Sequence, residues 1–407
     1  MTAEVIIIGG GASGAFASII SARMGRKVIL FEKNERIGRK LRITGKGRCN
    51  LTNNCTNDEL MNNIPVNPRF LYSAFSSFSP QDTMDFFESL GVPLKTERGR
   101  RVFPVSDNAN DIADALEKEM KKCGVKIIHE TVRHILTDDN ICTGVITSSG
   151  KEYNAESVLI ATGGKSYPAT GSTGDGYTLA NELGHTVTNI CPSLVPLVIK
   201  EKCCSEMMGL SLRNVCLSLF DYDKCIFSEQ GEMLFTHFGV SGPLVLSASS
   251  HIRDMKSGRY RISIDMKPAL NEQQLDKRIQ RDFIENQNRD FINAVRNLLP
   301  AKMIPVAVRL SGIPADKKAN SITKEERHKF AEIIRNFTLN VENFRPVEEA
   351  IITNGGIPVR EINPKTMESR LVSGLFFAGE VIDVDAYTGG FNLQIAFSTA
   401  YSAGINM

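Results

Sequence analysis

Short apolar runs separated by helical patterns dominate the first half of the chain. Val5 to Ile8 is fully apolar, and Gly9-Gly-Gly-Ala-Ser-Gly14 follows it directly. A small-residue helical pattern over 15–24 and a second apolar run over 27–31 come next. Other expected elements are a helix over 110–122 and strands over 125–128, over 132–136 and from 156 and 375. Apolar strands alternating with helices predict an α/β fold with a parallel sheet.

The pattern changes between Pro192 and Pro196 and returns after 351. Short β-rich runs fill 197–264, which is typical of a barrel or sandwich. A helical pattern over 271–299 closes at Pro300, and another over 323–337 begins with Thr323 as cap and Glu326 three residues later. We therefore expect a discontinuous domain, 1–190 with 346–407, and an insert, 191–345, whose helical part covers about 270–340.

Composition narrows the class of protein. The 407 residues are 42% hydrophobic, and 48 Lys and Arg against 46 Asp and Glu give a net charge of +2. This balance argues against a dedicated nucleic-acid binder, so we expect no nucleic-acid partner. Nine Cys without a CxxC pair indicate reduced cytoplasmic thiols and no metal site. No apolar run approaches the roughly 18 residues that span a bilayer, so we expect a soluble protein with no membrane partner.

The first thirty residues carry a dinucleotide-binding pattern of strand, GxGxxG, helix, strand and acid. Gly9 allows a tight turn, Gly11 lets the backbone approach a pyrophosphate, and Gly14 lets the helix pack on the strand. Glu32 ends the second strand and can accept hydrogen bonds from a ribose. An acid at this place favours FAD or NAD over NADP.

The C-terminal residues favour FAD over NAD. LFFAGE brings Glu380 to the end of a late strand, where a carboxylate can meet the ribityl hydroxyls. The following TGGFNLQIA opens a helix whose N-terminus can face the flavin pyrimidine, where negative charge gathers on reduction. A domain that bound only NAD would not need these last residues to return to the first strand.

Four stretches resemble one family: GRKLRITGKGRCNLTNN, ATGGKSYPATGSTGDGYTLANELGH, GEMLFTHFGVSGPLVLSAS and SGLFFAGEVIDVDAYTGGFNLQIAFSTAYSAG. Together they are similar to the BaiN-type NAD(P)/FAD-dependent oxidoreductases, which include the bile-acid-inducible flavoprotein and the aminoacetone oxidase group. The resemblance covers essentially the whole chain. It implies a Rossmann-like two-dinucleotide-fold FAD domain, interrupted by a β-barrel-like insert with a small helical cap.

Carried over to matching positions, the resemblance also implies the cofactor contacts. In addition to Gly9, the expected FAD-binding residues are Gly11, Ala12, Ser13, Gly14, Glu32, Lys33, Arg39, Lys40, Gly45, Lys46, Val132, Thr162, Gly163, Glu380, Asn392 and Leu393. NAD(P)H is expected as a transient co-substrate, because no second GxGxxG offers it a site.

Catalytic residues are not identified by the sequence. His237, Tyr387 and Lys46 are candidates for a proton donor, although a structural role is favoured for His237. Cys49 would have a depressed pKa if its basic neighbours faced it, but a packing role is favoured. The basic loop 98–101 either recruits a dinucleotide or a carboxylate substrate or is simply solvated.

The expected activity is reduction of a small organic acceptor by NAD(P)H through FAD. By resemblance, the acceptor is an activated C=C bond in a steroid-like or bile-acid-like enone. A second hypothesis is a flavin oxidase that passes electrons from a small amine such as aminoacetone to oxygen. A third is a flavin-binding redox regulator without turnover.

Overall fold

The computed structural model describes residues 3–407, which form two compact units. Unit 1 comprises Met1–Ser193 and Val347–Met407, and unit 2 comprises Leu194–Pro346. The α/β class, the parallel sheet and the barrel predicted from the sequence are confirmed. Among the described residues, no helix is long and apolar enough to cross a membrane.

A five-stranded parallel sheet forms the centre of unit 1, in the order β19-β10-β1-β2-β6. All residues of β1, β2 and β19 are buried, as their unbroken apolar sequences require. The register pairs Val5 with Val28 on one side and with Ser157 on the other. The strands are β1 Val5–Ile8, β2 Val28–Phe31, β6 Lys126–Ile128, β10 Ser157–Ile160 and β19 Leu375–Phe377.

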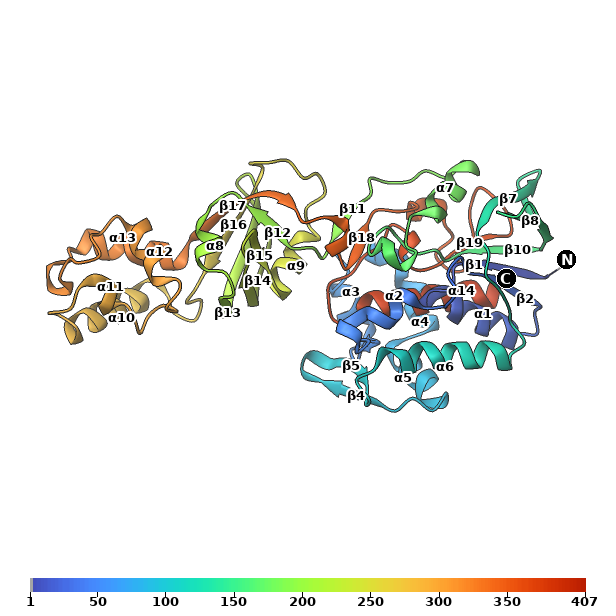
Figure 1. Ribbon diagram of the computed structural model, residues 1–407, viewed down its shortest axis with the longest axis horizontal. Coiled ribbons are helices and arrows are strands. Elements are labelled where there is room, and N and C mark those ends of the chain that lie inside the picture. The colour runs from blue at the N-terminus through green and yellow to red at the C-terminus, as the bar shows by residue number, and fades with distance from the viewer. Residues whose placement is uncertain (1–2) are drawn as a thin grey trace. The chain divides into compact units, whose positions relative to one another are not determined.

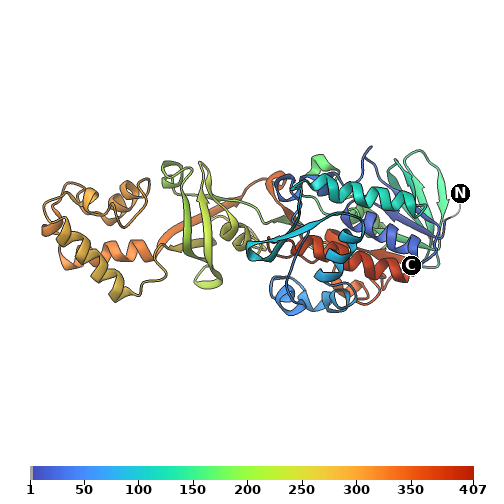
Figure 2. The same ribbon diagram turned by 90° about the horizontal axis from the view of Figure 1, so that it is seen from below.

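Three helices lie side by side along this sheet in Figures 1 and 2: α1 Ala12–Arg23, α6 Ala109–Lys122 and α14 Phe391–Asn406. α1 packs against both others, so the first and last helices of the chain are neighbours. At Gly404, a Cβ atom would lie 2.9 Å from Cβ of Ile20, so this approach requires the small residue. The start of α14 lies beside Thr52, because a Cβ on Gly390 would lie 2.3 Å from the carbonyl oxygen of that residue.

The other strands of unit 1 form three small sheets, β3-β5-β4, β7-β8-β9 and β11-β18. These strands are β3 Thr52–Asn53, β4 Leu94–Glu97, β5 Arg101–Pro104, β7 Val132–Asp138, β8 Ile141–Thr147, β9 Glu152–Asn154, β11 Cys191–Ser193 and β18 Ile352–Asn354. The remaining α-helices are α2 Arg39–Ile43, α3 Asn57–Asn62, α4 Tyr72–Ser77, α5 Pro80–Ser89 and α7 Asp175–Glu182.

Unit 2 contains a closed six-stranded barrel in the order β12-β15-β14-β13-β16-β17. Inward residues alternate with outward ones, as in β16, whose Tyr260, Ile262 and Ile264 are buried. The strands are β12 Leu197–Ile199, β13 Ser211–Asp221, β14 Lys224–Phe235, β15 Gly239–Ser241, β16 Tyr260–Asp265 and β17 Phe337–Phe344. Two helices accompany them, α8 Cys203–Glu206 and α9 Pro243–Ser249.

The helical part of unit 2 corrects one expectation. The pattern over 271–299 is not one helix, because α10 spans Glu272–Glu285 and α11 spans Phe291–Ala294. Asn286 leaves the helical conformation at φ −119°, and the Asn- and Gln-rich residues after it favour turns over helix. α12 Ile304–Ser311 and α13 Lys324–Arg335 follow, and α13 has the predicted capping box of Thr323 and Glu326.

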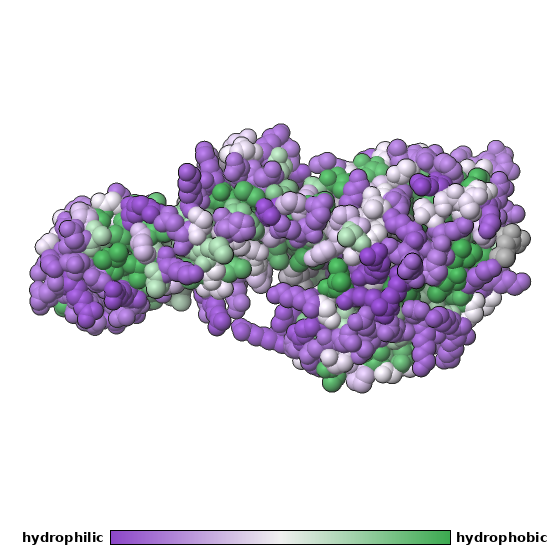
Figure 3. Space-filling view, in the orientation of Figure 1, coloured by the Kyte–Doolittle hydropathy of each residue, from purple (hydrophilic) through white to green (hydrophobic). Residues whose placement is uncertain are grey.

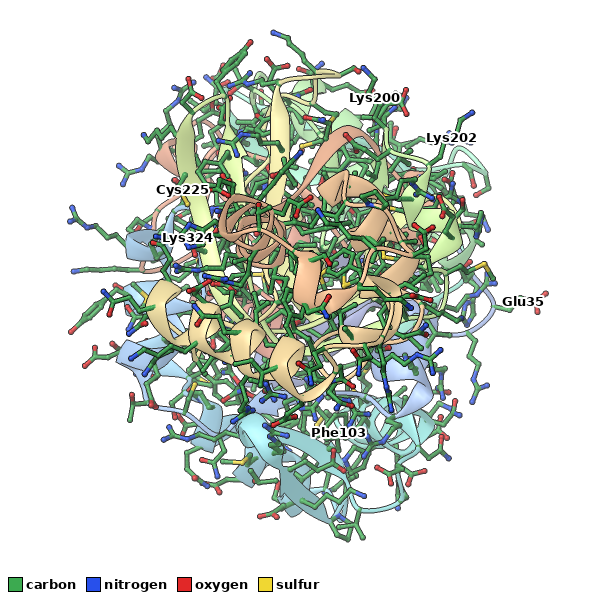
Figure 4. The ribbon with its side chains drawn as sticks, turned by 90° about the vertical axis from the view of Figure 1, so that its left-hand side faces the viewer. Glu35, Phe103, Lys200, Lys202, Cys225 and Lys324 are labelled. Carbon is green, nitrogen blue, oxygen red and sulfur yellow. The ribbon has the colours of Figure 1, made fainter. Side chains whose placement is uncertain are left out.

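The surface of this helical part is mixed. Figure 3 shows hydrophobic areas among hydrophilic ones, and Ile284 and Leu310 are among its exposed apolar side chains. Lys324 projects outward from the start of α13 in Figure 4.

Candidate functional site

The glycines in the turn between β1 and α1 have different structural roles. Gly9 has φ +104°, which favours glycine, and its N–H donates to the carbonyl of Phe31 at 2.8 Å. A Cβ on Gly14 would lie 1.9 Å from the carbonyl oxygen of Gly9. A Cβ on Gly11 would meet nothing within 4 Å. Gly9 and Gly14 therefore build the turn, whereas Gly11 borders open space where α1 begins without a side-chain cap.

The end of β2 places Glu32 against this turn. Its carboxylate is almost fully buried and accepts from the N–H of Gly10 and the N–H of Asn34, both at 2.8 Å. Lys33 forms an ion pair at 2.7 Å with Asp175, the first residue of α7. Ala12 and Ser13 form the first turn of α1. Hydrogen bonds and an ion pair thus order the site predicted for the adenosine part of the cofactor.

The basic loop over 38–50 follows a few residues later. Its backbone turns through left-handed conformations at Gly45, φ 58°, and Lys46, φ 59°. Arg39 donates to the side-chain oxygen of Asn34 at 2.8 Å. Lys46 is exposed and makes no hydrogen bond or ion pair with any described residue. Its ammonium group is therefore available to a ligand.

Lys40 connects this loop with the C-terminal part of the chain. Its ammonium group lies 2.7 Å from Oε2 of Glu380 and donates to the hydroxyl of Ser166 at 2.7 Å. The other carboxylate oxygen of Glu380 accepts from the N–H of Thr353 at 2.8 Å. Both charged side chains are about one-fifth exposed. Residues 340 positions apart in sequence thus form one partly buried ion pair.

Thr162 and Gly163 lie in the turn after β10, beside the same pair. The hydroxyl oxygen of Thr162 is buried without a hydrogen-bond partner among the described atoms. At Gly164, a Cβ would lie 2.7 Å from Oε1 of Glu380, so the turn and the carboxylate are closely packed. The hydroxyl faces α7, where a Cβ on Gly176 would lie 2.2 Å from it, so protein atoms enclose it.

The start of α14 leaves backbone donors available. Its N-cap is Gly390, at φ 99° and with no side-chain cap, so the first-turn N–H groups lack a side-chain acceptor. Asn392 accepts from the N–H of Ala386 at 2.9 Å, and its amide donates to the carbonyls of Ala386 and Tyr387. Leu393 packs partly buried against the core. Asn392 thus holds the preceding loop, and the helix end can attract negative charge.

The other three predicted residues belong to further segments of the chain. Val132 is buried as the first residue of β7, where it pairs with Thr147. His237 belongs to unit 2, in the turn between β14 and β15, and is exposed with its ring 5.0 Å from that of Phe238. Tyr387 is half-buried in the loop that Asn392 holds.

Cys49 does not meet the condition for a depressed pKa. Its side chain is fully buried, and burial raises the pKa of the thiol to about 12. Arg48 turns to Glu97 and Asp107, and its guanidinium lies 4.2 Å from the ring centroid of Phe103, which is labelled in Figure 4. The neighbouring cation therefore does not activate the thiol, and the packing role is confirmed.

The sequence did not reveal a buried cluster around His185. Nδ1 of the imidazole lies 2.9 Å from Glu361, and Nε2 lies 2.8 Å from the hydroxyl of Ser369. Although this order resembles a hydrolase triad, Ser369 also accepts from the N–H groups of Leu371 and Val372 and is 8% exposed. Burial lowers the pKa of His185. The cluster therefore fixes a chain reversal and has no access to substrate.

Comparisons with known proteins agree with the Rossmann-like fold of unit 1. The family model described as HI0933-like protein Rossmann domain matches residues 3–406. The chain is 32% identical to the 3-dehydro-bile acid delta(4,6)-reductase of Clostridium scindens over 402 residues, 98% of this chain and 97% of that protein. It is 30% identical to the ribosomal RNA dihydrouridine synthase of Haemophilus influenzae over 410 residues, 99% and 98% of the two chains.

A solved structure shares the fold across its length. The 3-ketosteroid delta1-dehydrogenase of Sterolibacterium denitrificans superimposes with a TM-score of 0.53 and 13% identity, covering 99% of both chains. At this identity the likeness concerns the fold alone. Because one similar protein is named as an enzyme of ribosomal RNA, the predicted absence of nucleic-acid partners is not confirmed. The family match over nearly the whole chain confirms the resemblance found in the sequence, and the chain is a flavin-dependent oxidoreductase of the HI0933-like family.

Proposed function

We propose that the chain binds FAD and uses NAD(P)H to reduce a C=C bond conjugated with a carbonyl group. The names of two similar proteins support this reaction. A delta(4,6)-reductase of a 3-dehydro bile acid saturates a double bond conjugated with a ketone, and a dihydrouridine synthase saturates the uracil bond conjugated with a carbonyl. Both reactions consume one hydride and one proton, although their substrates differ greatly in size.

The candidate site fits FAD at three places. The open space at Gly11 admits a pyrophosphate next to the N-terminus of α1. The partly buried Lys40–Glu380 pair offers polar contacts to a ribityl chain. The uncapped N-terminus of α14 can stabilise negative charge on a flavin ring. Bound FAD would accept a hydride from NAD(P)H and deliver it to the substrate carbon.

The chain itself must position the substrate and supply the proton. The ammonium group of Lys46 has no partner within residues 3–407, and Tyr387 lies in the loop before α14. We propose these two as proton-donor candidates, with His237 as a third from unit 2. Arg39, Lys40 and Lys46 would also compensate negative charge on the cofactor.

A second candidate acceptor is uridine in RNA. Besides the name of the H. influenzae protein, one feature of unit 2 favours it. Residues 270–336 contain 13 Lys and Arg against nine Asp and Glu, a local excess within a chain of net charge +2. Lys324 and Lys329 are among those that form no ion pair with described residues. Such a helical surface can attract phosphate groups.

Anaerobic stopped-flow spectroscopy tests the proposal. The purified flavoprotein is mixed with NADH or NADPH, and the reduced protein is then mixed with an acceptor. The acceptors are a 3-oxo-4,6-diene bile acid, a uridine-containing ribosomal RNA fragment, and oxygen; aminoacetone is tested separately as an electron donor. We expect rapid bleaching by one nicotinamide and reoxidation by a conjugated C=C compound. Bleaching by aminoacetone and by neither nicotinamide would establish the oxidase instead.

A further inference from the structure

An open groove in unit 1 lies beside the start of α14. Its volume is about 480 Å³, and every lining residue belongs to unit 1. Three segments far apart in sequence form it: the stretch 53–63, the loop 99–101 and the turn 388–391. Phe391, the first residue of α14, and Cys55 are its hydrophobic lining residues, and the others are Asn, Glu, Arg, Thr and Gly.

Hydrogen bonds and close packing hold the three segments together. The buried amide of Asn53 donates to the carbonyls of Gly99 and Gly389, each at 3.0 Å. Gly390 cannot carry a side chain, because a Cβ would lie 2.3 Å from the carbonyl oxygen of Thr52. These contacts therefore fix the shape of the groove, and they hold the loop 99–101 at its edge.

Two guanidinium groups line this groove with different partners. Arg101 donates from Nε to the carbonyl of Arg98 at 3.1 Å and has no carboxylate within 4 Å among the described residues. Both of its terminal nitrogens thus remain available for a forked contact. Arg100, at φ 58°, forms an ion pair with Glu59, and both side chains are about half exposed. An exposed pair of this kind is weak and can exchange its carboxylate for another anion.

We propose that this groove binds the anionic group, a carboxylate or a phosphate, of the molecule that exchanges electrons with the flavin. Arg101 contacts the anion directly, and Arg100 joins it by leaving Glu59. The planar guanidinium fork matches both oxyanions, which lysine in the same place would not do. This inference rests on the proposed function, because the groove lies beside the start of α14. Binding of an anion in the groove can nevertheless be measured without turnover.

The first experiment measures binding without chemistry. The full-length flavoprotein is titrated with inorganic pyrophosphate at constant ionic strength, with isothermal calorimetry as the readout. Arg101→Ala and Arg100→Ala should each raise the dissociation constant about tenfold, the usual loss for one charge-assisted contact. Arg98→Ala is the matched control, because Arg98 lies in the same loop but does not line the groove. Equal effects of all three variants, or no binding by the wild-type protein, would overturn the proposal.

The second experiment identifies the source of the anion. Flavin reduction by NADPH and NADH, and reoxidation by a bile-acid enone and by its uncharged methyl ester, are followed separately. If Arg101→Ala raises only the nicotinamide concentration needed for half-maximal flavin reduction, the groove binds the phosphates of the nicotinamide. A loss of the preference for the acid over its ester assigns it to the substrate carboxylate. If neither nicotinamide reduces the flavin, the proposed function fails while the pyrophosphate result still stands.

Discussion

The glycine turn over 9–14 and the basic loop over 38–50 would both meet the cofactor, but they are ordered in different ways. The turn depends on close backbone packing at Gly9 and Gly14 and on one side chain, Glu32, which accepts from the N–H of Gly10. The loop depends on side chains, since Lys40 pairs with Glu380 and Arg48 with Glu97 and Asp107. The glycine motif and the acid after the second strand therefore specify the turn, whereas the loop requires the rest of the fold.

The largest effects are expected where the turn is altered. Gly14→Ala would place a Cβ against the carbonyl of Gly9 and should lower the free energy of unfolding by about 2 kcal/mol or more. Gly11→Ala meets no atom within 4 Å and has an extended backbone, so it should fold normally. It should nevertheless weaken FAD binding about a hundredfold, because the methyl group occupies the pyrophosphate space.

Thermal unfolding and FAD titration of the two variants separate the glycine roles. Normal stability of Gly14→Ala would contradict the packing role. Full FAD affinity of Gly11→Ala would show that the pyrophosphate does not lie at this turn.

An intermediate effect is expected at the ion pair that anchors the loop. Glu380→Gln retains an acceptor for the N–H of Thr353 but leaves the ammonium of Lys40 without its carboxylate. Since both side chains are mostly buried, the free energy of unfolding should fall by about 1–3 kcal/mol. Glu206→Gln, which breaks the exposed pair with Arg309, is the control and should have no measurable effect. Equal denaturation midpoints for both variants would show that the Lys40–Glu380 pair does not anchor the loop.

These two regions also show how far sequence can predict this molecule. Strands β1 and β2 follow from their unbroken apolar runs, and the capping box of α13 follows from Thr323 and Glu326. The Lys40–Glu380 pair could not be predicted, because residue spacing carries no information about side chains that meet across 340 positions. The same limit explains Cys49, whose pKa depends on burial and on where Arg48 turns.

The smallest effect is expected at Lys46, which is exposed and whose side chain forms no hydrogen bond or ion pair with residues 3–407. Lys46→Ala should leave the unfolding midpoint unchanged. If the ammonium lies near the flavin, its loss should make the flavin potential more negative by about 20 mV, equivalent to about 1 kcal/mol for two electrons. Lys46→Arg keeps the charge and should keep the potential, so spectroelectrochemical titration of both variants separates charge from side-chain shape. An unchanged potential and unchanged FAD content in Lys46→Ala would exclude this residue from the cofactor site, and the ordered side chains of Arg39 and Lys40 would then carry the loop's electrostatic role alone.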